Sequence, residues 1–206
     1  MEGSVGFSGS LATQHIKGHL KAPLWWKIKN SRNLLRGWRI IFGKLFGLPM
    51  FYATLHAQLI RYVNGVRQVV DYGLVSVRVV TTAFAELMVD QLQTETSVWG
   101  DFKYHDSGTG VVAEDVGDTG LGTPSTEQVG DDRSTGTQTE GTSVQYQSVG
   151  TITYDGTGGA ITEHGLFNTL RGTGPTLMDR SKFDAINVVA TDAISFTYTL
   201  SVTAGG

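Results

Sequence analysis

The chain has 206 residues, no cysteine and a formal net charge of −3. This length can bury the core of one domain, and the absence of cysteine excludes disulfides and thiolate metal sites. The charge is uneven, because residues 1–70 hold ten Lys or Arg and one acid, whereas residues 71–206 hold six Lys or Arg and eighteen acids. This split predicts a basic arm on an acidic globular body.

Neither a membrane-spanning helix nor a secretory signal is expected. The longest uncharged window, residues 45–60, has sixteen residues and contains Pro49 and His56. A bilayer span needs roughly 20 apolar residues. The first fifteen residues lack the basic region followed by an apolar run that is typical of a signal peptide.

The basic arm is predicted to comprise residues 1–49, of which residues 1–22 are small, polar and expected to be extended. From Leu24 onward, apolar residues recur at helical spacing with basic residues between them, as far as Gly47 and Pro49. This pattern predicts one or two short, basic amphipathic helices. Their aromatic and basic residues are the candidate partner-binding residues, namely Trp25, Trp26, Lys27, Lys29, Arg32, Arg36, Trp38 and Arg39.

The second predicted domain, residues 50–206, begins where the composition changes at Met50, and translation from that residue would leave this domain nearly complete. Alternating residues on both sides of Asn64-Gly65 predict a β-hairpin over residues 55–72, because this dipeptide suits a two-residue turn. A further strand is expected over residues 74–80. The period then changes to that of a helix over residues 82–93, which we expect to lie across the sheet with Thr82 as its N-cap.

The remainder of the chain is rich in strand-forming residues, with turn residues between short runs and an acidic loop over residues 111–132. The expected strands cover residues 98–104, 134–138, 143–154, 160–168, 183–189 and 193–203. Several short strands without alternating helices are typical of all-β proteins. The predicted fold is therefore mainly β, an antiparallel, jelly-roll-like β-sandwich with one amphipathic helix and a basic N-terminal arm.

Two pairs of adjacent residues combine histidine with an acid, His105 with Asp106 and Glu163 with His164. If their strands were neighbours, the four side chains could form a metal site with nitrogen and oxygen ligands. Neighbouring residues on a strand point to opposite faces, however, so each pair supplies at most one inward ligand. We therefore expect hydrogen-bonded buried histidines or exposed loop histidines, and assign no metal ligand.

Other motifs do not form a convincing catalytic or cofactor site. Residues 108–113 match the dinucleotide pattern G-x-G-x-x-A, but the acids and the glycine that follow do not suit a phosphate-binding helix. The acids Glu114, Asp115 and Asp118 fit a solvated loop better than a calcium loop or a glycosidase pair. Asp179 and Arg180 are expected to stabilise a short turn. We expect a protein that is not an enzyme and has no cofactor.

The basic arm has four possible binding roles. Tryptophan and basic side chains can stack on bases and neutralise phosphates, or lie on an anionic bilayer surface. The same residue types can anchor a chain to an acidic neighbouring protein, which is the preferred interpretation, or they can pack on the chain's own domain.

Four segments of the second domain resemble structural proteins of tailed-bacteriophage virions. The first is residues 102–110 (FKYHDSGTG), and the second is residues 161–167 (ITEHGLF). The others are residues 177–188 (LMDRSKFDAINV) and the alternating run of residues 194–202. The similarity extends over roughly residues 57–206.

The resemblance implies a non-enzymatic structural protein located in the virion. The preferred role is a capsid decoration or cement protein that binds the major capsid protein or other virion proteins, and the alternative is a tail fibre, spike or adaptor in host attachment. By analogy with decoration proteins we expect a homo-oligomer, with a trimer favoured. Nucleic acid is a further possible partner of the basic arm. A carbohydrate-processing enzyme is the third hypothesis, and it would require a carboxylate pair in a cleft.

Overall fold

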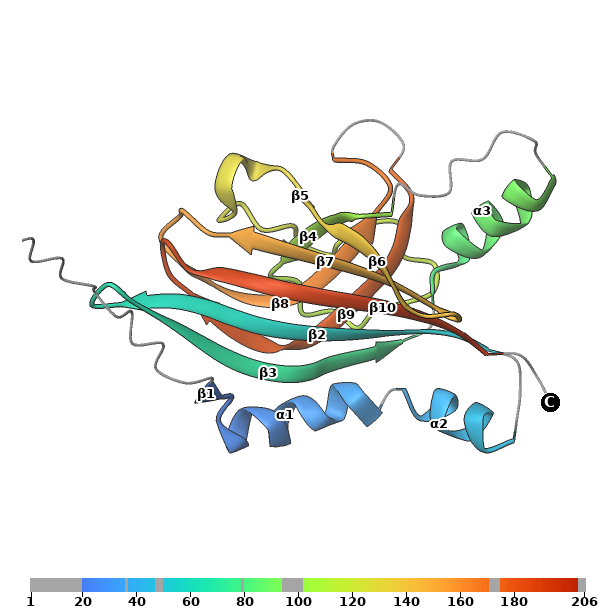
Figure 1. The fold of residues 1–206 in the computed structure, drawn as a ribbon, viewed down its shortest axis with the longest axis horizontal. Coiled ribbons are helices and arrows are strands. Elements are labelled where there is room, and N and C mark those ends of the chain that lie inside the picture. The colour runs from blue at the N-terminus through green and yellow to red at the C-terminus, as the bar shows by residue number, and fades with distance from the viewer. Residues whose placement is uncertain are drawn as a thin grey trace, which may run out of the picture.

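The computed structural model describes residues 20–35, 37–46, 50–78, 80–93, 102–170 and 175–203. The fold is mainly β, with two sheets and three α-helices among these residues (Figure 1). None of the described helices is long and apolar enough to span a membrane.

The larger sheet has six strands in the order β1-β3-β2-β10-β7-β6. Their bounds are β1 Leu20–Lys21, β2 Met50–Val63, β3 Val66–Arg78, β6 Thr137–Thr142, β7 Gln145–Thr153 and β10 Ala193–Thr203. The short pair β1 and β3 is parallel and the other pairs are antiparallel, so this sheet is mixed rather than wholly antiparallel as predicted.

The smaller sheet has four antiparallel strands in the order β5-β4-β8-β9. Their bounds are β4 Tyr104–Gly108, β5 Ser134–Thr135, β8 Gly159–Phe167 and β9 Leu177–Val188. Of the strand expected over residues 98–104, residues 98–101 lie outside the described part, residues 102–103 are not in a strand, and β4 begins at Tyr104. β9 begins earlier than expected, because the motif at Asp179 and Arg180 belongs to the strand and not to a turn.

The predicted hairpin is confirmed. β2 and β3 pair in antiparallel register on both sides of Asn64 and Gly65, whose φ angles are 51° and 74°. The separate strand expected over residues 74–80 is instead the second half of β3. Gly73, with a φ of 68°, lies where the pairing with β2 shifts register, so the strand continues through an irregularity.

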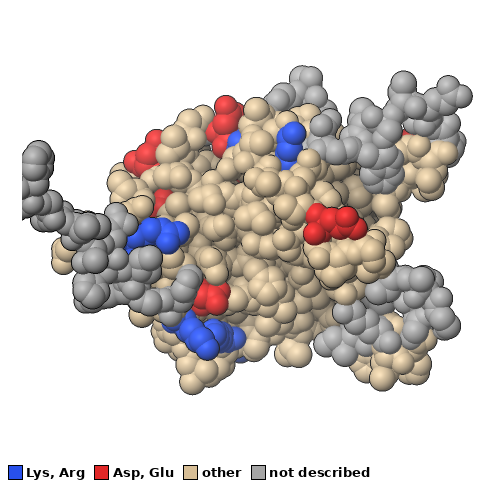
Figure 2. All heavy atoms as spheres, viewed as in Figure 1, with Lys and Arg blue, Asp and Glu red and all other residues tan. Residues whose placement is uncertain are grey.

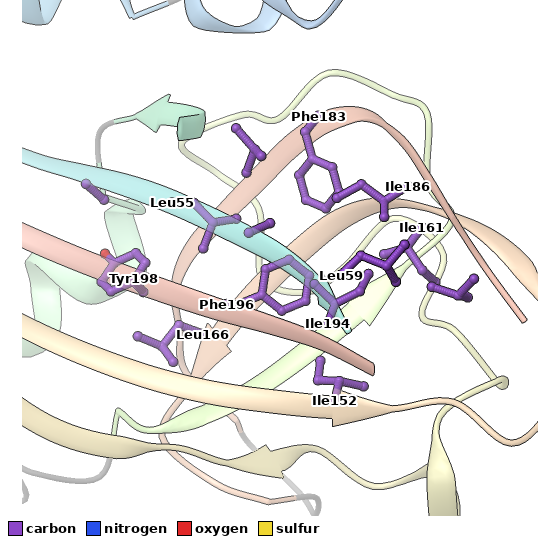
Figure 3. Close-up of a cluster of buried hydrophobic side chains, with 14 of the residues drawn as sticks. Leu55, Leu59, Ile152, Ile161, Leu166, Phe183, Ile186, Ile194, Phe196 and Tyr198 are labelled. Carbon is purple, nitrogen blue, oxygen red and sulfur yellow. The ribbon is translucent and has the colours of Figure 1, made fainter. Parts of the chain in front are cut away.

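Both sheets contribute to one hydrophobic core (Figure 3). Alternate residues of β10 are buried because successive side chains of a strand point to opposite faces. Phe196 of β10 contacts Phe183 of β9, with ring centroids 6.1 Å apart, so this aromatic pair joins the two sheets. The labelled core residues are Leu55, Leu59, Ile152, Ile161, Leu166, Phe183, Ile186, Ile194, Phe196 and Tyr198.

The helix α3 (Thr82–Gln93) has the predicted bounds. Its N-cap is Thr81 rather than Thr82, because Thr81 Oγ1 accepts a hydrogen bond of 3.2 Å from the backbone N–H of Phe84. Phe84 is buried in the core, but Leu92 is 84 % exposed. The helix therefore packs through its N-terminal half and extends away from the sheets (Figure 1), instead of lying across them.

Two helices, α1 (Leu24–Leu35) and α2 (Trp38–Leu45), confirm the helical pattern predicted near the N-terminus. Ala22 and Trp26 belong to the same core as the strands. Part of the segment predicted to be an arm is thus integrated in the fold. Residues 1–19 lie outside the described part.

Replacing Trp26 with Ala should lower the free energy of unfolding by about 3–5 kcal/mol, as is typical when a large buried aromatic side chain is lost. The adjacent Trp25 is 63 % exposed, so Trp25→Ala should change stability by no more than about 0.5 kcal/mol. Chemical denaturation of both variants measures the difference. Equal losses of unfolding free energy in the two variants would mean that α1 does not pack through the face that carries Trp26.

Replacing Gly65 with Val should destabilise the hairpin by about 1 kcal/mol or more, because a β-branched residue resists the positive φ of this turn. Gly120 is the matched control. A Cβ at either glycine would have no atom within 4 Å, but Gly120 does not have a positive φ. Thermal unfolding should show a lower midpoint for Gly65→Val than for Gly120→Val. A parental midpoint for Gly65→Val would contradict the turn assignment.

Candidate functional site

The helix α1 connects the two sheets through polar contacts as well as through Trp26. The Trp26 ring contacts Tyr72 of β3 at 4.7 Å, and its Nε1 donates a hydrogen bond of 2.9 Å to the backbone carbonyl of Ala185 in β9. Asn30 Nδ2 donates to the carbonyl of Val75 in β3, and Asn30 Oδ1 accepts from the N–H of Asp184 in β9, both at 2.9 Å. One helix face is thereby fixed to strands of both sheets.

The opposite face of α1 is apolar and basic. Leu24, Trp25, Ile28 and Leu35 are 63–73 % exposed, which is unusual for four large apolar side chains on one short helix. The exposed basic residues Lys27, Lys29 and Arg32 lie on the same helix, which contains no acid. We define the α1 outer face as Leu24, Trp25, Lys27, Ile28, Arg32 and Leu35.

The predicted partner-binding residues therefore separate into groups. Trp25, Lys27 and Arg32 are exposed on α1. Lys29 Nζ lies 3.8 Å from Asp184 Oδ1. The prediction is wrong for Trp26, because its side chain is 2 % exposed and serves the core.

The remaining predicted partner-binding residues lie after α1. Trp38 begins α2, is 52 % exposed and contacts Phe42 edge to face at 5.4 Å. Arg39 belongs to α2 by its backbone. Arg36 lies outside the described residues.

The two histidines of the His–acid pairs meet between the sheets. His105 Nδ1 lies 2.9 Å from His164 Nε2, and His105 Nε2 lies 2.8 Å from Ser148 Oγ of β7. The His164 ring also contacts Phe196 at 4.6 Å. Both histidines have no exposed surface, which confirms the expected buried, hydrogen-bonded arrangement.

Burial governs the ionisation of this interior cluster. It lowers the pKa of His105 to about 3 and lowers the pKa of His164 well below its usual value, with His105 as a second cause. Burial also raises the pKa of Asp179 to about 6, although Ser181 donates a hydrogen bond to Asp179 Oδ1. His164 Nδ1, Asp179 Oδ2 and the Tyr198 hydroxyl have no hydrogen-bond partner among the described residues.

The acids of the same pairs point to the other side of the smaller sheet. Glu163 accepts hydrogen bonds from the backbone N–H groups of Gly110, Gly122 and Thr123 and from Arg180 Nε, at 2.7–3.1 Å. This buried carboxylate therefore holds the acidic loop against β8. Arg180 pairs with Glu163 and Asp118, which corrects the expected pairing of Arg180 with Asp179 in a turn.

A second buried acid fixes the end of the same loop. Asp106 Oδ1 accepts a hydrogen bond of 2.9 Å from Gln128 Nε2, and Asp106 Oδ2 lies 3.2 Å from Arg133 Nε. Ser107 Oγ also donates a hydrogen bond of 3.1 Å to Gln128 Oε1. These carboxylates are occupied by structural partners and are shielded from solvent, so they do not form an open carboxylate pair.

The glycines of the G-x-G-x-x-A match have a packing role. A Cβ at Gly108 or Gly110 would clash with the Glu163 side chain, and no α-helix begins in the described residues directly after Gly110. The pattern therefore makes room for a carboxylate and does not precede a phosphate-binding helix. No group of three or more His, Asp and Glu residues in the described part of the chain is placed to hold a metal ion.

A polar groove of about 560 Å³ lies on the outer face of the larger sheet, opposite the core. It is lined by hydroxyl, amide, imidazole and carboxylate groups of β2, β3, β7 and β10, namely His56, Gln58, Asp71, Gln147, Ser195, Thr197 and Thr199, together with Gly73. Figure 2, in the same view as Figure 1, shows few charged residues on this side of the molecule. The groove offers hydrogen bonds with little net charge.

Sequence reasoning missed Asn30 and Ser148. The amphipathic pattern of the helix places the polar Asn30 on its solvent side. Only the structure shows that Asn30 connects β3 with β9. Ser148 gave no signal, since serine is common on exposed strand faces. Comparison with protein-family models, curated proteins and solved structures finds no match to this chain.

The buried histidines predict a loss of stability in acid. In the unfolded chain they gain protons below a pKa of about 6.5, whereas burial keeps them neutral in the folded chain, so each should lower the free energy of unfolding by about 1 kcal/mol per pH unit between pH 6 and 4. Asp179 acts in the opposite direction there, because it keeps its proton in the folded chain up to a pKa of about 6.

Chemical denaturation at pH 6, 5 and 4 measures this balance. From these groups, the parent should lose about 1 kcal/mol per pH unit, and Asp179→Asn should lose about twice that per unit because the opposing proton is removed. Equal slopes for the parent and Asp179→Asn would show that Asp179 does not hold its proton in the fold.

Proposed function

We propose that this protein is a non-enzymatic structural protein of a tailed-phage virion, most specifically a capsid decoration or cement protein that binds neighbouring capsid subunits. The observation that carries the proposal is the α1 outer face. This face exposes four large apolar side chains beside basic residues, while the other face of α1 is anchored in the core. A helix fixed in this way is a preorganised docking element.

The proposed architecture is a jelly-roll-like β-sandwich whose two layers are the two sheets. The shared core and the Phe183–Phe196 contact support two facing layers. The order of strands along the chain also supports it, because β4 and β5 lie in one sheet, β6 and β7 in the other, β8 and β9 in the first again, and β10 in the second. Such exchange between sheets is typical of jelly rolls.

A binding role is favoured over catalysis by the placement of the titratable groups. His105, His164, Asp106 and Glu163 are at most 3 % exposed. Their hydrogen bonds to protein groups give them a structural role, and their burial prevents contact with a substrate. The carboxylate pair in a cleft that a carbohydrate-processing enzyme needs is not formed by these residues.

The proposed partner of the α1 outer face is an acidic surface of the major capsid protein or of another virion protein. Tryptophan and arginine are common anchors of protein interfaces, and the absence of acids from α1 and α2 favours a partner of opposite charge. Nucleic acid is the alternative ligand. Binding to phosphates would fall steeply with salt, whereas binding through Trp25 and its apolar neighbours would not.

A tail fibre, spike or adaptor is the second candidate function. The polar groove on the larger sheet favours it, because hydroxyl and amide groups suit the hydroxyl-rich glycans of a host surface. Copy number in the particle distinguishes the two roles. Hundreds of copies support decoration, and about a dozen support the tail. In either role we propose a closed homo-oligomer, with a trimer favoured by analogy.

The double replacement Trp25→Asp and Ile28→Asp should reduce binding to purified particles at least tenfold, because it places charge in the centre of the α1 outer face. Removing residues 1–49 is a less specific test, since it also removes Ala22 and Trp26 from the core. Co-sedimentation with particles lacking the protein measures the affinity.

The control is Val129→Asp, at a 53 % exposed position in the acidic loop away from α1. It should bind like the parent, and both proteins should keep the parental circular dichroism spectrum. Parental binding by the double variant would remove the α1 outer face from the mechanism. Equal loss in both proteins would indicate a different docking surface.

A further inference from the structure

The helix α3 has the opposite character to the helices at the N-terminus. It contains Glu86 and Asp90, contains no basic residue, and exposes 54 % of Val89 and 84 % of Leu92. Its buried contacts come from Phe84, with Leu87 and Met88 packed partly against the core. The C-terminal half of α3 is therefore an exposed surface that is both apolar and acidic.

The helix α2 is the basic counterpart. Its sequence contains two basic residues, Arg39 and Lys44, and no acid. Trp38, Phe42 and Leu45 are 51–75 % exposed. Exposed apolar patches on soluble proteins mark interaction sites.

The positions of the two helices exclude mutual coverage within one chain. Figure 1 shows α2 and α3 at the same end of the molecule but on opposite sides of the sheets. A second copy can bring its own α3 to α2. The opposite charges of α2 and α3 would favour this pairing over pairing of like helices, because α2 against α2 or α3 against α3 places like charges together.

We propose that α2 of one copy docks against α3 of a second copy. The contact buries Trp38, Phe42 and Leu45 of α2 against Val89 and Leu92 of α3, and it brings a helix whose sequence has two basic residues beside a helix with two acids. This inference deepens the homo-oligomer of the proposed function and names its interface. It leaves the α1 outer face available for a different virion protein.

This contact joins two different surfaces, α2 and α3, and each copy carries both. Every copy can therefore make two contacts, and a closed assembly built from them is a ring or a twofold pair. Helices of 8 and 12 residues form a small contact, and a closed assembly gains from making two of them per copy.

Charge exchange tests the pairing. One variant carries Arg39→Glu and Lys44→Glu, a second carries Glu86→Lys and Asp90→Lys, and a third carries all four substitutions. Analytical ultracentrifugation of the full chain should show a dissociation constant raised at least tenfold in each of the first two variants. The third should return to within about threefold of the parent, because the signs are exchanged and complementarity is restored.

The apolar part of the contact has its own test. Leu92→Asp should also weaken assembly at least tenfold, and it should leave the thermal midpoint of the isolated chain unchanged because Leu92 is outside the core. A parent that remains monomeric at about 0.1 mM would overturn the proposal, since mass action favours assembly at that concentration. Failure of the four-substitution variant to recover would overturn it as well.

Failure of this interface can be separated from failure of the proposed function. Trp25→Asp with Ile28→Asp should lose particle binding and still assemble, whereas the α3 variant Glu86→Lys with Asp90→Lys should lose assembly. If the chain is monomeric yet binds particles through α1, the α2–α3 contact is wrong and the docking role stands. If it assembles through α2 and α3 but never binds particles, the reverse holds.

Discussion

The structure depends on how the edges of its two sheets are joined. Within the described residues, β9 is an edge strand of the smaller sheet, and the outer side of β3 pairs with a strand only at the two residues of β1. Unpaired edge groups are costly when buried and invite aggregation when exposed. Asn30 satisfies one backbone group of each strand, and Trp26 fills the space beside them. A single helix thus closes the gap between the layers.

This closure has a direct consequence for function. Because the Trp26 and Asn30 face is used for folding, the orientation of α1 is fixed, and the Trp25 and Ile28 face must point away from the core. The apolar and basic surface is therefore presented rigidly. Glu163 and Arg180 fix the acidic loop through buried, charge-assisted hydrogen bonds. Histidines and acids that suggested a metal site instead contribute to packing.

Much of the local structure was predictable, because it rests on local rules. Asn64-Gly65 specified its hairpin through the turn, and the period over residues 82–93 specified α3. The sequence could not distinguish Trp25 from Trp26, because the two residues are adjacent and have the same neighbours along the chain. Only the position of β9 decides which tryptophan is buried. It placed His164 on one predicted strand and His105 directly after another, but their contact depends on the pairing of β4 with β8.

Oxidative footprinting of the two adjacent tryptophans, in the free protein and on the particle, separates a core role from a docking role. Trp26 should be protected in both states, because the core buries it, and Trp25 should be modified in the free protein and protected on the particle. Modification of Trp25 at the same rate in both states would contradict docking through α1. Rapid modification of Trp26 in the free protein would contradict closure of the sheets by this helix.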